Sequence, residues 1–121
     1  IFVGKIMELS NHSSTVSSVT DPSQSIAVSL LNESRTIGVA SGIIGDLIQI
    51  DFIPVDEQIE ENDLVVTSGL EASIPSGLLV GLVNTVRQEA DSPFKQAIVE
   101  PLSDSRRIAS VLVIISTETL P

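Results

Sequence analysis

The chain lacks cysteine, tryptophan and tyrosine, and its three phenylalanines are its only aromatic residues. The absence of cysteine excludes disulfides, thiolate zinc sites and a cysteine nucleophile. Aromatic residues make up 2% of the 121 positions, so the stacking platforms on which many proteins hold single-stranded nucleic acids are also missing. A hydrophobic core in this chain must therefore be built from Val, Ile, Leu and Ala.

Basic residues are also scarce. Six Lys and Arg stand against 16 Asp and Glu, which gives a formal net charge of −10. So acidic a surface repels phosphate backbones and anionic headgroups, and we expect no nucleic-acid binding. No apolar run reaches the ~18 residues that a membrane-spanning helix needs. Because the sequence opens on IFVGKI without a methionine, we expect it to be a piece of a longer protein, and the lack of a spanning run here says nothing about the rest of that protein.

Short apolar segments, many of them β-branched, recur between turn signals along the whole chain. No window keeps the 3.6-residue period of an ordinary amphipathic helix. Many short strands at close spacing are typical of a small antiparallel barrel or sandwich. We therefore predict an all-β chain with strands near residues 1–9, 15–20, 25–31, 36–41, 46–53, 63–68, 78–86, 95–102 and 111–116.

The segment DLIQIDFI, residues 46–53, shows the clearest two-residue period. A strand presents alternate side chains to opposite faces. The period therefore places Ile48, Ile50 and Phe52 on the buried face and Gln49 and Asp51 on the wet face. We expect all three apolar side chains to belong to the core.

The sequence Thr67-Ser68-Gly69 raises the possibility of a serine nucleophile. A serine hydrolase needs a base within hydrogen-bond reach, and the one histidine is His12, in the polar turn-like segment SNHSST. No G-x-S-x-G elbow surrounds Ser68. We interpret Ser68 as a turn residue and expect no catalytic residue. A hydrolase-like barrel that uses His12 and Ser68 is the alternative.

Metal and cofactor sites are not indicated either. The acidic run between residues 56 and 63 lacks the order of carboxylates and the central glycine of a calcium-binding loop. We interpret it as a solvated connector and expect no metal and no cofactor. A second alternative, a secreted ligand-binding β-barrel, would need an open interior.

Four apolar residues lie in the segment between two predicted strands: Leu70, Ile74, Pro75 and Leu78. Apolar side chains in such a loop either plug the end of a barrel or form a contact surface for a partner. Both readings stay open, and we expect these four residues to be the partner-binding candidates.

Four pieces of the sequence, in order, resemble the family of rod shape-determining proteins called MreC. The hallmark piece is DLVVTSGLEASIPSGLLVGLV, residues 63–83. The other three are VGKIMELSNHSSTVSSVTDPSQSIAV, GVASGIIGDLIQIDFIPVDEQIEENDLV and FKQAIVEPLSDSRRIASVLVI. Glu71 and Ala72 stand where the family usually has two glycines, and Asn62 replaces a glycine; these departures bear on loop geometry.

The resemblance implies a small antiparallel six-stranded β-barrel like one barrel of a chymotrypsin-like protease, without a working catalytic triad. It implies a strand contribution to a neighbouring barrel as well. Residues 1–9 would end the first barrel, residues 10–100 would form the second, and residues 108–116 would be a closing strand.

The family further implies a non-enzymatic scaffold of the cell-elongation machinery, which organises peptidoglycan synthesis and cell shape. It would act on the extracytoplasmic face of the bacterial plasma membrane, anchored by a segment absent from this sequence. Implied partners are further copies of itself, a penicillin-binding transpeptidase and the membrane protein MreD.

Overall fold

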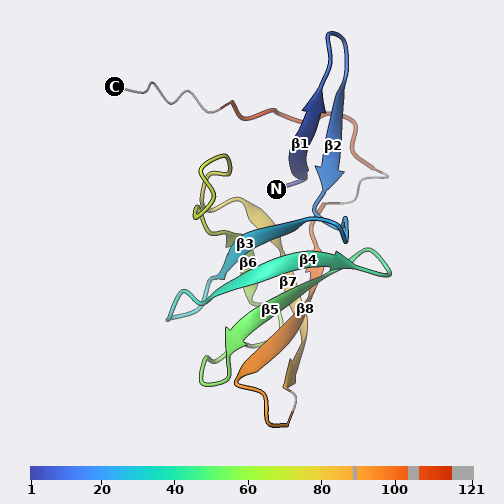
Figure 1. Ribbon diagram of the computed structural model, residues 1–121. Helices are drawn as coiled ribbons and strands as arrows, with labels where there is room; N and C mark the ends of the chain where they lie inside the picture. Colours follow the sequence, from blue (N-terminus) through green and yellow to red (C-terminus); the bar gives the residue numbers. More distant parts are fainter. Residues whose placement is uncertain (89, 104–106, 116–121) are drawn as a thin grey trace.

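The computed structural model describes residues 1–88, 90–103 and 107–115, and the regular structure within them is entirely β-strand (Figure 1). The strands match the first eight predicted segments. They are β1 (Gly4–Leu9), β2 (Ser14–Ser18), β3 (Ser25–Leu30), β4 (Ile37–Ile43), β5 (Leu47–Pro54), β6 (Leu64–Thr67), β7 (Leu79–Gln88) and β8 (Phe94–Pro101).

Six of these strands, β3 to β8, form a closed antiparallel barrel in the order β3-β4-β5-β8-β7-β6. The ladder between β3 and β6 closes the ring, with Val28 opposite Thr67 and Leu30 opposite Val65. The predicted six-stranded barrel is thus confirmed. Closure gives each of the six strands a partner on both sides, which limits the free strand edge that the barrel presents.

The interior of the barrel is filled with aliphatic side chains, as the lack of aromatic residues requires. Buried residues alternate with more exposed ones along the whole of β3 and β4. A barrel packed in this way leaves no support for the ligand-binding alternative, which needs an open interior. The hydrophobic residues with no exposed surface are Val28, Leu30, Ile48, Ile50, Ile53, Val65, Val80, Ala97 and Val99.

The prediction for β5 is correct for Ile48 and Ile50, which are fully buried, and wrong for Phe52, which is 60% exposed. The ladder between β5 and β8 changes register between Ile50 and Ile53. Such a bulge inserts one extra residue and reverses the alternation beyond it. Phe52, with a φ of 66°, therefore faces outward and Ile53 takes its place in the core.

Strands β1 and β2 form a two-stranded hairpin that stands on one end of the barrel (Figure 1). Phe2 and Val19, at its base, are buried in the barrel core, and the Phe2 amide donates to the Leu79 carbonyl at 2.7 Å. Most of the hairpin beyond this base is exposed, including Leu9. The barrel sheet thus begins at β3, and the preceding strand β2 pairs with β1 instead.

After β8 the chain returns to the same end of the barrel, where the Leu102 amide donates to the Val80 carbonyl at 3.0 Å. Residues 107–115 have no strand in the structure, and Val111 to Ile115 are exposed; residue 116 of the expected closing strand lies outside the described residues. The assignment of residues 1–9 to the end of a first barrel and of residues 108–116 to a closing strand stays a prediction. In the described ranges no helix is long and apolar enough to cross a membrane.

Candidate functional site

The candidate site is the loop of residues 68–78, which joins β6 to β7. Thr67 organises it: its buried side-chain Oγ1 donates to the Pro75 carbonyl at 2.6 Å and accepts from the Leu78 amide at 3.0 Å. The Thr67 backbone also exchanges hydrogen bonds with Gly77 and Leu78 at 2.9 Å each. A buried hydroxyl with both partners in place fixes the loop against the end of its own strand.

Two glycines with positive φ shape this loop, Gly69 at 80° and Gly77 at 86°. A Cβ on Gly69 would lie 2.7 Å from the Ser76 Cβ, so the turn needs glycine both for its conformation and for space. The loop therefore folds back on itself, and residue 69 packs directly against residue 76.

The four partner-binding candidates divide between the two readings. Ile74 is 6% exposed and belongs to the barrel core, and Leu78 packs partly against that core. Leu70 is 67% exposed, and Pro75 is exposed as well. The loop thus plugs the barrel with Ile74 and presents Leu70 to the outside. Both interpretations therefore apply to the same loop, each to a different residue.

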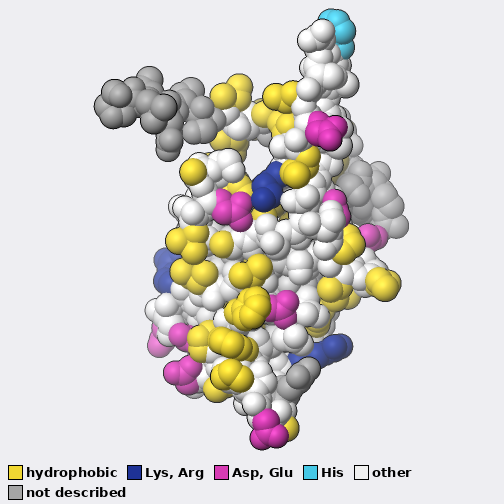
Figure 2. All heavy atoms as spheres, in the orientation of Figure 1, with side chains coloured by type: hydrophobic (Ala, Val, Ile, Leu, Met, Phe, Trp, Pro, Cys, Tyr) yellow, Lys and Arg dark blue, Asp and Glu magenta, His cyan; other side chains and the backbone are white. Residues whose placement is uncertain are grey.

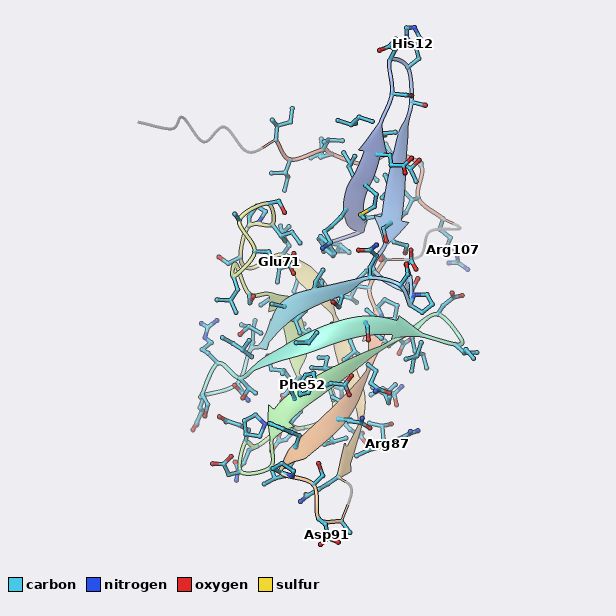
Figure 3. The ribbon with its side chains drawn as sticks, in the orientation of Figure 1. His12, Phe52, Glu71, Arg87, Asp91 and Arg107 are labelled. Atoms are coloured by element: carbon cyan, nitrogen blue, oxygen red, sulfur yellow. The ribbon has the colours of Figure 1, made fainter. Side chains whose placement is uncertain are left out.

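Ser68 and His12 lie on different parts of the molecule. The Ser68 hydroxyl accepts a hydrogen bond from the Leu70 amide at 3.2 Å, which is the local pattern of a serine in a turn. His12 is exposed in the turn between β1 and β2, at the tip of the hairpin and pointing away from the barrel (Figure 3). Among the described residues no hydrogen bond joins the two side chains, which the hydrolase alternative requires.

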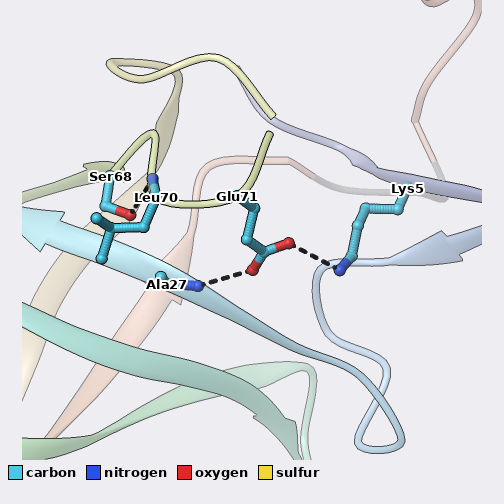
Figure 4. A network of polar contacts seen from close by, with 5 residues as sticks. All are labelled: Lys5, Ala27, Ser68, Leu70 and Glu71. Carbon is cyan, nitrogen blue, oxygen red and sulfur yellow. Dashed lines mark hydrogen bonds and ion pairs between the residues drawn. The ribbon is translucent and has the colours of Figure 1, made fainter. Parts of the chain in front are cut away.

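Glu71 links this loop to both other parts of the fold (Figure 4). Its Oε1 accepts from the Ala27 amide of β3 at 3.1 Å, and its Oε2 accepts from Lys5 Nζ of β1 at 3.2 Å. Sequence reasoning noted Glu71 only as a replacement for a glycine. An acidic residue in an otherwise apolar loop was the signal available for such a link.

Asp21 organises the connection between the hairpin and the barrel. Its carboxylate accepts from the Ser23 amide at 2.9 Å, from the Ser23 hydroxyl at 2.7 Å and from the Ser17 hydroxyl at 3.0 Å. These hydrogen bonds, those of Ser23 first, lower the pKa of Asp21 below its ordinary value of 3.8. The turn predicted at residues 21–24 is confirmed by the bond from the Gln24 amide to the Asp21 carbonyl.

The acidic connector after β5 contains a turn rather than a metal site. The Asp63 carboxylate accepts from the Glu60 amide at 2.9 Å. Asn62, which follows Glu60 in this turn, has a φ of 71°, a conformation that asparagine tolerates better than most residues. Across the part of the chain that the structure describes, no three His, Asp or Glu side chains lie close enough to hold a metal ion.

Comparisons with known proteins point to one family. Residues 2–115 match the family model described as rod shape-determining protein MreC, barrel core. The cell shape-determining protein MreC of Haemophilus influenzae is 32% identical over 113 residues, which cover 93% of this chain and 32% of that protein. The chain thus spans about a third of the length of this relative.

Two solved structures give the same result for the fold. MreC from Pseudomonas aeruginosa, at 26% identity, superimposes with a TM-score of 0.73 over 82% of this chain and 64% of its own. A complex between penicillin-binding protein PBP2 and MreC from Helicobacter pylori contains a chain at 21% identity, with a TM-score of 0.71 over 86% of this chain and 65% of that one. With the family model matched from residue 2 to residue 115 and a closed six-stranded barrel in between, the chain belongs to the MreC family of cell shape-determining proteins.

Proposed function

We propose that this chain is the barrel region of a non-enzymatic scaffold that holds a penicillin-binding transpeptidase and further copies of itself on the extracytoplasmic face of the plasma membrane. The observation that carries the proposal is the loop of residues 68–78. It is rigidly hydrogen-bonded and offers an exposed apolar side chain, Leu70, while its one nucleophile candidate, Ser68, is used within the turn. Such a loop supplies a contact surface and no chemistry.

The choice of partner has separate support. The Helicobacter pylori protein of the same fold was solved in complex with a penicillin-binding protein. For the chain described here, a transpeptidase of that class and the membrane protein MreD are proposed partners. In this scheme the barrel positions the transpeptidase and organises peptidoglycan synthesis, and therefore cell shape.

The binding experiment compares two variants that put a carboxylate on an exposed apolar loop residue. Leu70→Asp alters the proposed contact, and Ile44→Asp alters the turn between β4 and β5, where Ile44 is 99% exposed. Isothermal titration against the extracytoplasmic part of the transpeptidase from the same cell should show about tenfold or greater loss for Leu70→Asp. Ile44→Asp should bind like the wild type. No binding by the wild type would refute the transpeptidase as partner.

The enzymatic alternative is tested by Ser68→Ala. In the full-length parent, the scaffold hypothesis expects this variant to restore rod shape in cells that lack the protein. Loss of cell shape with an intact fold would favour catalysis at Ser68. Circular dichroism of the purified variant is the control for folding.

Self-association is tested by sedimentation equilibrium in a salt series. The net charge of −10 opposes contact between copies at low ionic strength, and salt screens this repulsion within about 8 Å at physiological strength. Association should therefore strengthen as salt rises. A strict monomer at ~1 mM, about −4 kcal/mol in affinity, would place self-association in other parts of the parent protein.

A further inference from the structure

The two exposed phenylalanines form the most unusual surface feature of the barrel. The chain has three aromatic residues, and two of them, Phe52 on β5 and Phe94 on β8, meet edge to face with ring centroids 5.7 Å apart and planes at 83°. Phe52 is 60% exposed and Phe94 41% exposed. A chain so poor in aromatic residues has placed most of them on its surface, at one point.

The backbone of Phe52 adopts a strained conformation that places the ring on the surface. Within the described residues, its φ of 66° is one of five positive values at residues other than glycine, and the other four are Arg, Asp or Asn. Bulky residues rarely adopt this strained conformation, and residues in such conformations are concentrated at functional sites. An unbulged strand would have buried the ring. The bulge therefore turns a core residue into a surface residue.

A carboxylate lies beside the two rings. Asp51, Phe52, Ser92, Phe94 and Gln96 line a shallow surface hollow of about 280 Å³. Figure 3 shows Phe52 on the outer face of the barrel, and Figure 2 shows hydrophobic side chains beside carboxylates on this face.

Hydrogen bonds fix the position of that carboxylate. Asp51 Oδ1 accepts from Gln49 at 3.0 Å and from Gln96 at 2.9 Å. Among the described residues Oδ2 accepts no hydrogen bond, so it is available to a partner. Lys95, next to Phe94 in the sequence, donates to the Glu57 carbonyl at 2.8 Å and is thereby occupied.

The apolar surface extends onto the neighbouring strand. Val39 of β4 lies opposite Asp51 in the ladder, and Val39 and Ile37 are both exposed on the outer face of that strand. An exposed apolar patch bordered by polar residues is typical of a protein interaction site. We call the five residues Ile37, Val39, Asp51, Phe52 and Phe94 the aromatic patch.

We propose that the aromatic patch docks a segment of a partner protein in which an aliphatic side chain stands next to an arginine or lysine. The aliphatic side chain fills the surface hollow that the two rings line together with Asp51, Ser92 and Gln96. The cation contacts Asp51 Oδ2 and the face of a phenylalanine ring, where it is attracted by the ring quadrupole. Charge selects this occupant over a second copy, because the chain carries 16 acidic against six basic residues.

A pair of small probes tests this chemistry without reference to any particular partner. N-acetyl-leucyl-arginine amide and its glutamate counterpart are titrated into the ¹⁵N-labelled chain, with dissociation constants expected in the millimolar range. The arginine probe should shift the amides of the aromatic patch and of Gln96 in a saturable way, and the glutamate probe should not. Equal response to both probes, no response, or shifts gathered elsewhere would overturn the proposal.

Substitution of Phe52 separates docking from folding. Phe52→Gly removes the ring and suits a φ of 66°, so the thermal midpoint should hold or rise while shifts by the arginine probe disappear. Phe52→Tyr keeps the ring and should keep the response. Asp51→Asn keeps an oxygen for Gln49 and Gln96 but should weaken arginine binding. A Phe52→Gly chain that responds like the wild type would refute the proposal.

The proposed transpeptidase partner is a second probe of binding at the aromatic patch. Phe52→Gly should weaken its binding about tenfold or more. If the wild type binds the transpeptidase and Phe52→Gly binds it equally well, the proposed function survives and the aromatic patch is refuted as its docking site. If the wild type fails to bind it, the proposed function fails, and the dipeptide titration decides on the patch. Loss of self-association in Phe52→Gly would assign the patch to a second copy and overturn the proposal.

Discussion

The barrel and the hairpin are both built from short β-branched strands, yet they have opposite environments. Each barrel strand pairs on both sides and covers a core of fully buried aliphatic side chains. The hairpin strands pair on one side, and side chains such as Met7, Leu9 and Val16 are largely exposed. Two-stranded sheets are marginal in water, so we expect most of the stability of this fold to come from the closed ring and its buried core.

The sharpest way to test this comparison is to truncate one aliphatic side chain in each region. Ile50→Ala, in the barrel core, should lower the free energy of unfolding by about 2–5 kcal/mol, because it removes transfer energy and leaves a cavity. Val16→Ala, on the exposed hairpin, should change it by less than about 0.5 kcal/mol. Urea denaturation measures both. Equal losses would show that the hairpin is part of the cooperative core.

The loop of residues 68–78 is expected to depend on one buried hydroxyl. Thr67→Val keeps the shape but leaves the Pro75 carbonyl and the Leu78 amide without their partner. Leaving buried polar groups unsatisfied costs about 1–3 kcal/mol. Thr67→Ser, which keeps the hydroxyl, is the matched control and should lose clearly less in the same denaturation experiment. A neutral Thr67→Val would mean that water replaces the hydroxyl.

The ion pair between Lys5 of the hairpin and Glu71 of the barrel loop should contribute little to stability. Glu71→Gln keeps an oxygen for the Ala27 amide and removes the charge opposite Lys5, which is about a quarter exposed. An ion pair of this exposure contributes about 0.2–1 kcal/mol. Hydrogen exchange of β1 amides should accelerate while exchange in the barrel core stays unchanged. Glu33→Gln, on an exposed turn, is the control; faster exchange throughout the barrel would contradict a local role.

The smallest expected effect concerns pH at the joint between the regions. Since hydrogen bonds lower the pKa of Asp21 in the folded chain, its contribution is present above the unfolded pKa of about 3.9. The contribution is lost as pH falls through the lower, folded value. The stability difference between wild type and Asp21→Asn should therefore shrink below pH ~4, as measured by thermal denaturation in a pH series. A stability difference that grows as the pH falls would contradict a lowered pKa of Asp21 in the folded chain.

Much of the fold could be predicted because the sequence repeats one physical signal, β-branched segments between turn residues. Period two placed Ile48 and Ile50 in the core correctly. The two-residue period failed at Phe52 because a bulge adds one residue to the ladder between two strands. The amino-acid composition of neither strand indicates where such an extra residue occurs. The bulge is a property of the pairing between β5 and β8, and the sequence of β5 alone does not reveal it.

The candidate site was less predictable for a related reason. Apolar residues in a loop between strands indicated either a plug or a contact surface, and the structure divides them, with Ile74 inside and Leu70 outside. The links made by Glu71 join residues that are 44 and 66 positions apart in the sequence. Spacing along the chain carries no information on such contacts, which depend on how the barrel closes.

The two segments that lead into and out of the barrel are attached to neighbouring residues of one strand. Phe2 bonds to Leu79 and Leu102 bonds to Val80, both at the end of the barrel where the hairpin stands (Figure 1). A pulling force applied between these two segments would therefore be carried across a few residues of β7. The opposite end of the barrel takes part in neither of these two attachments.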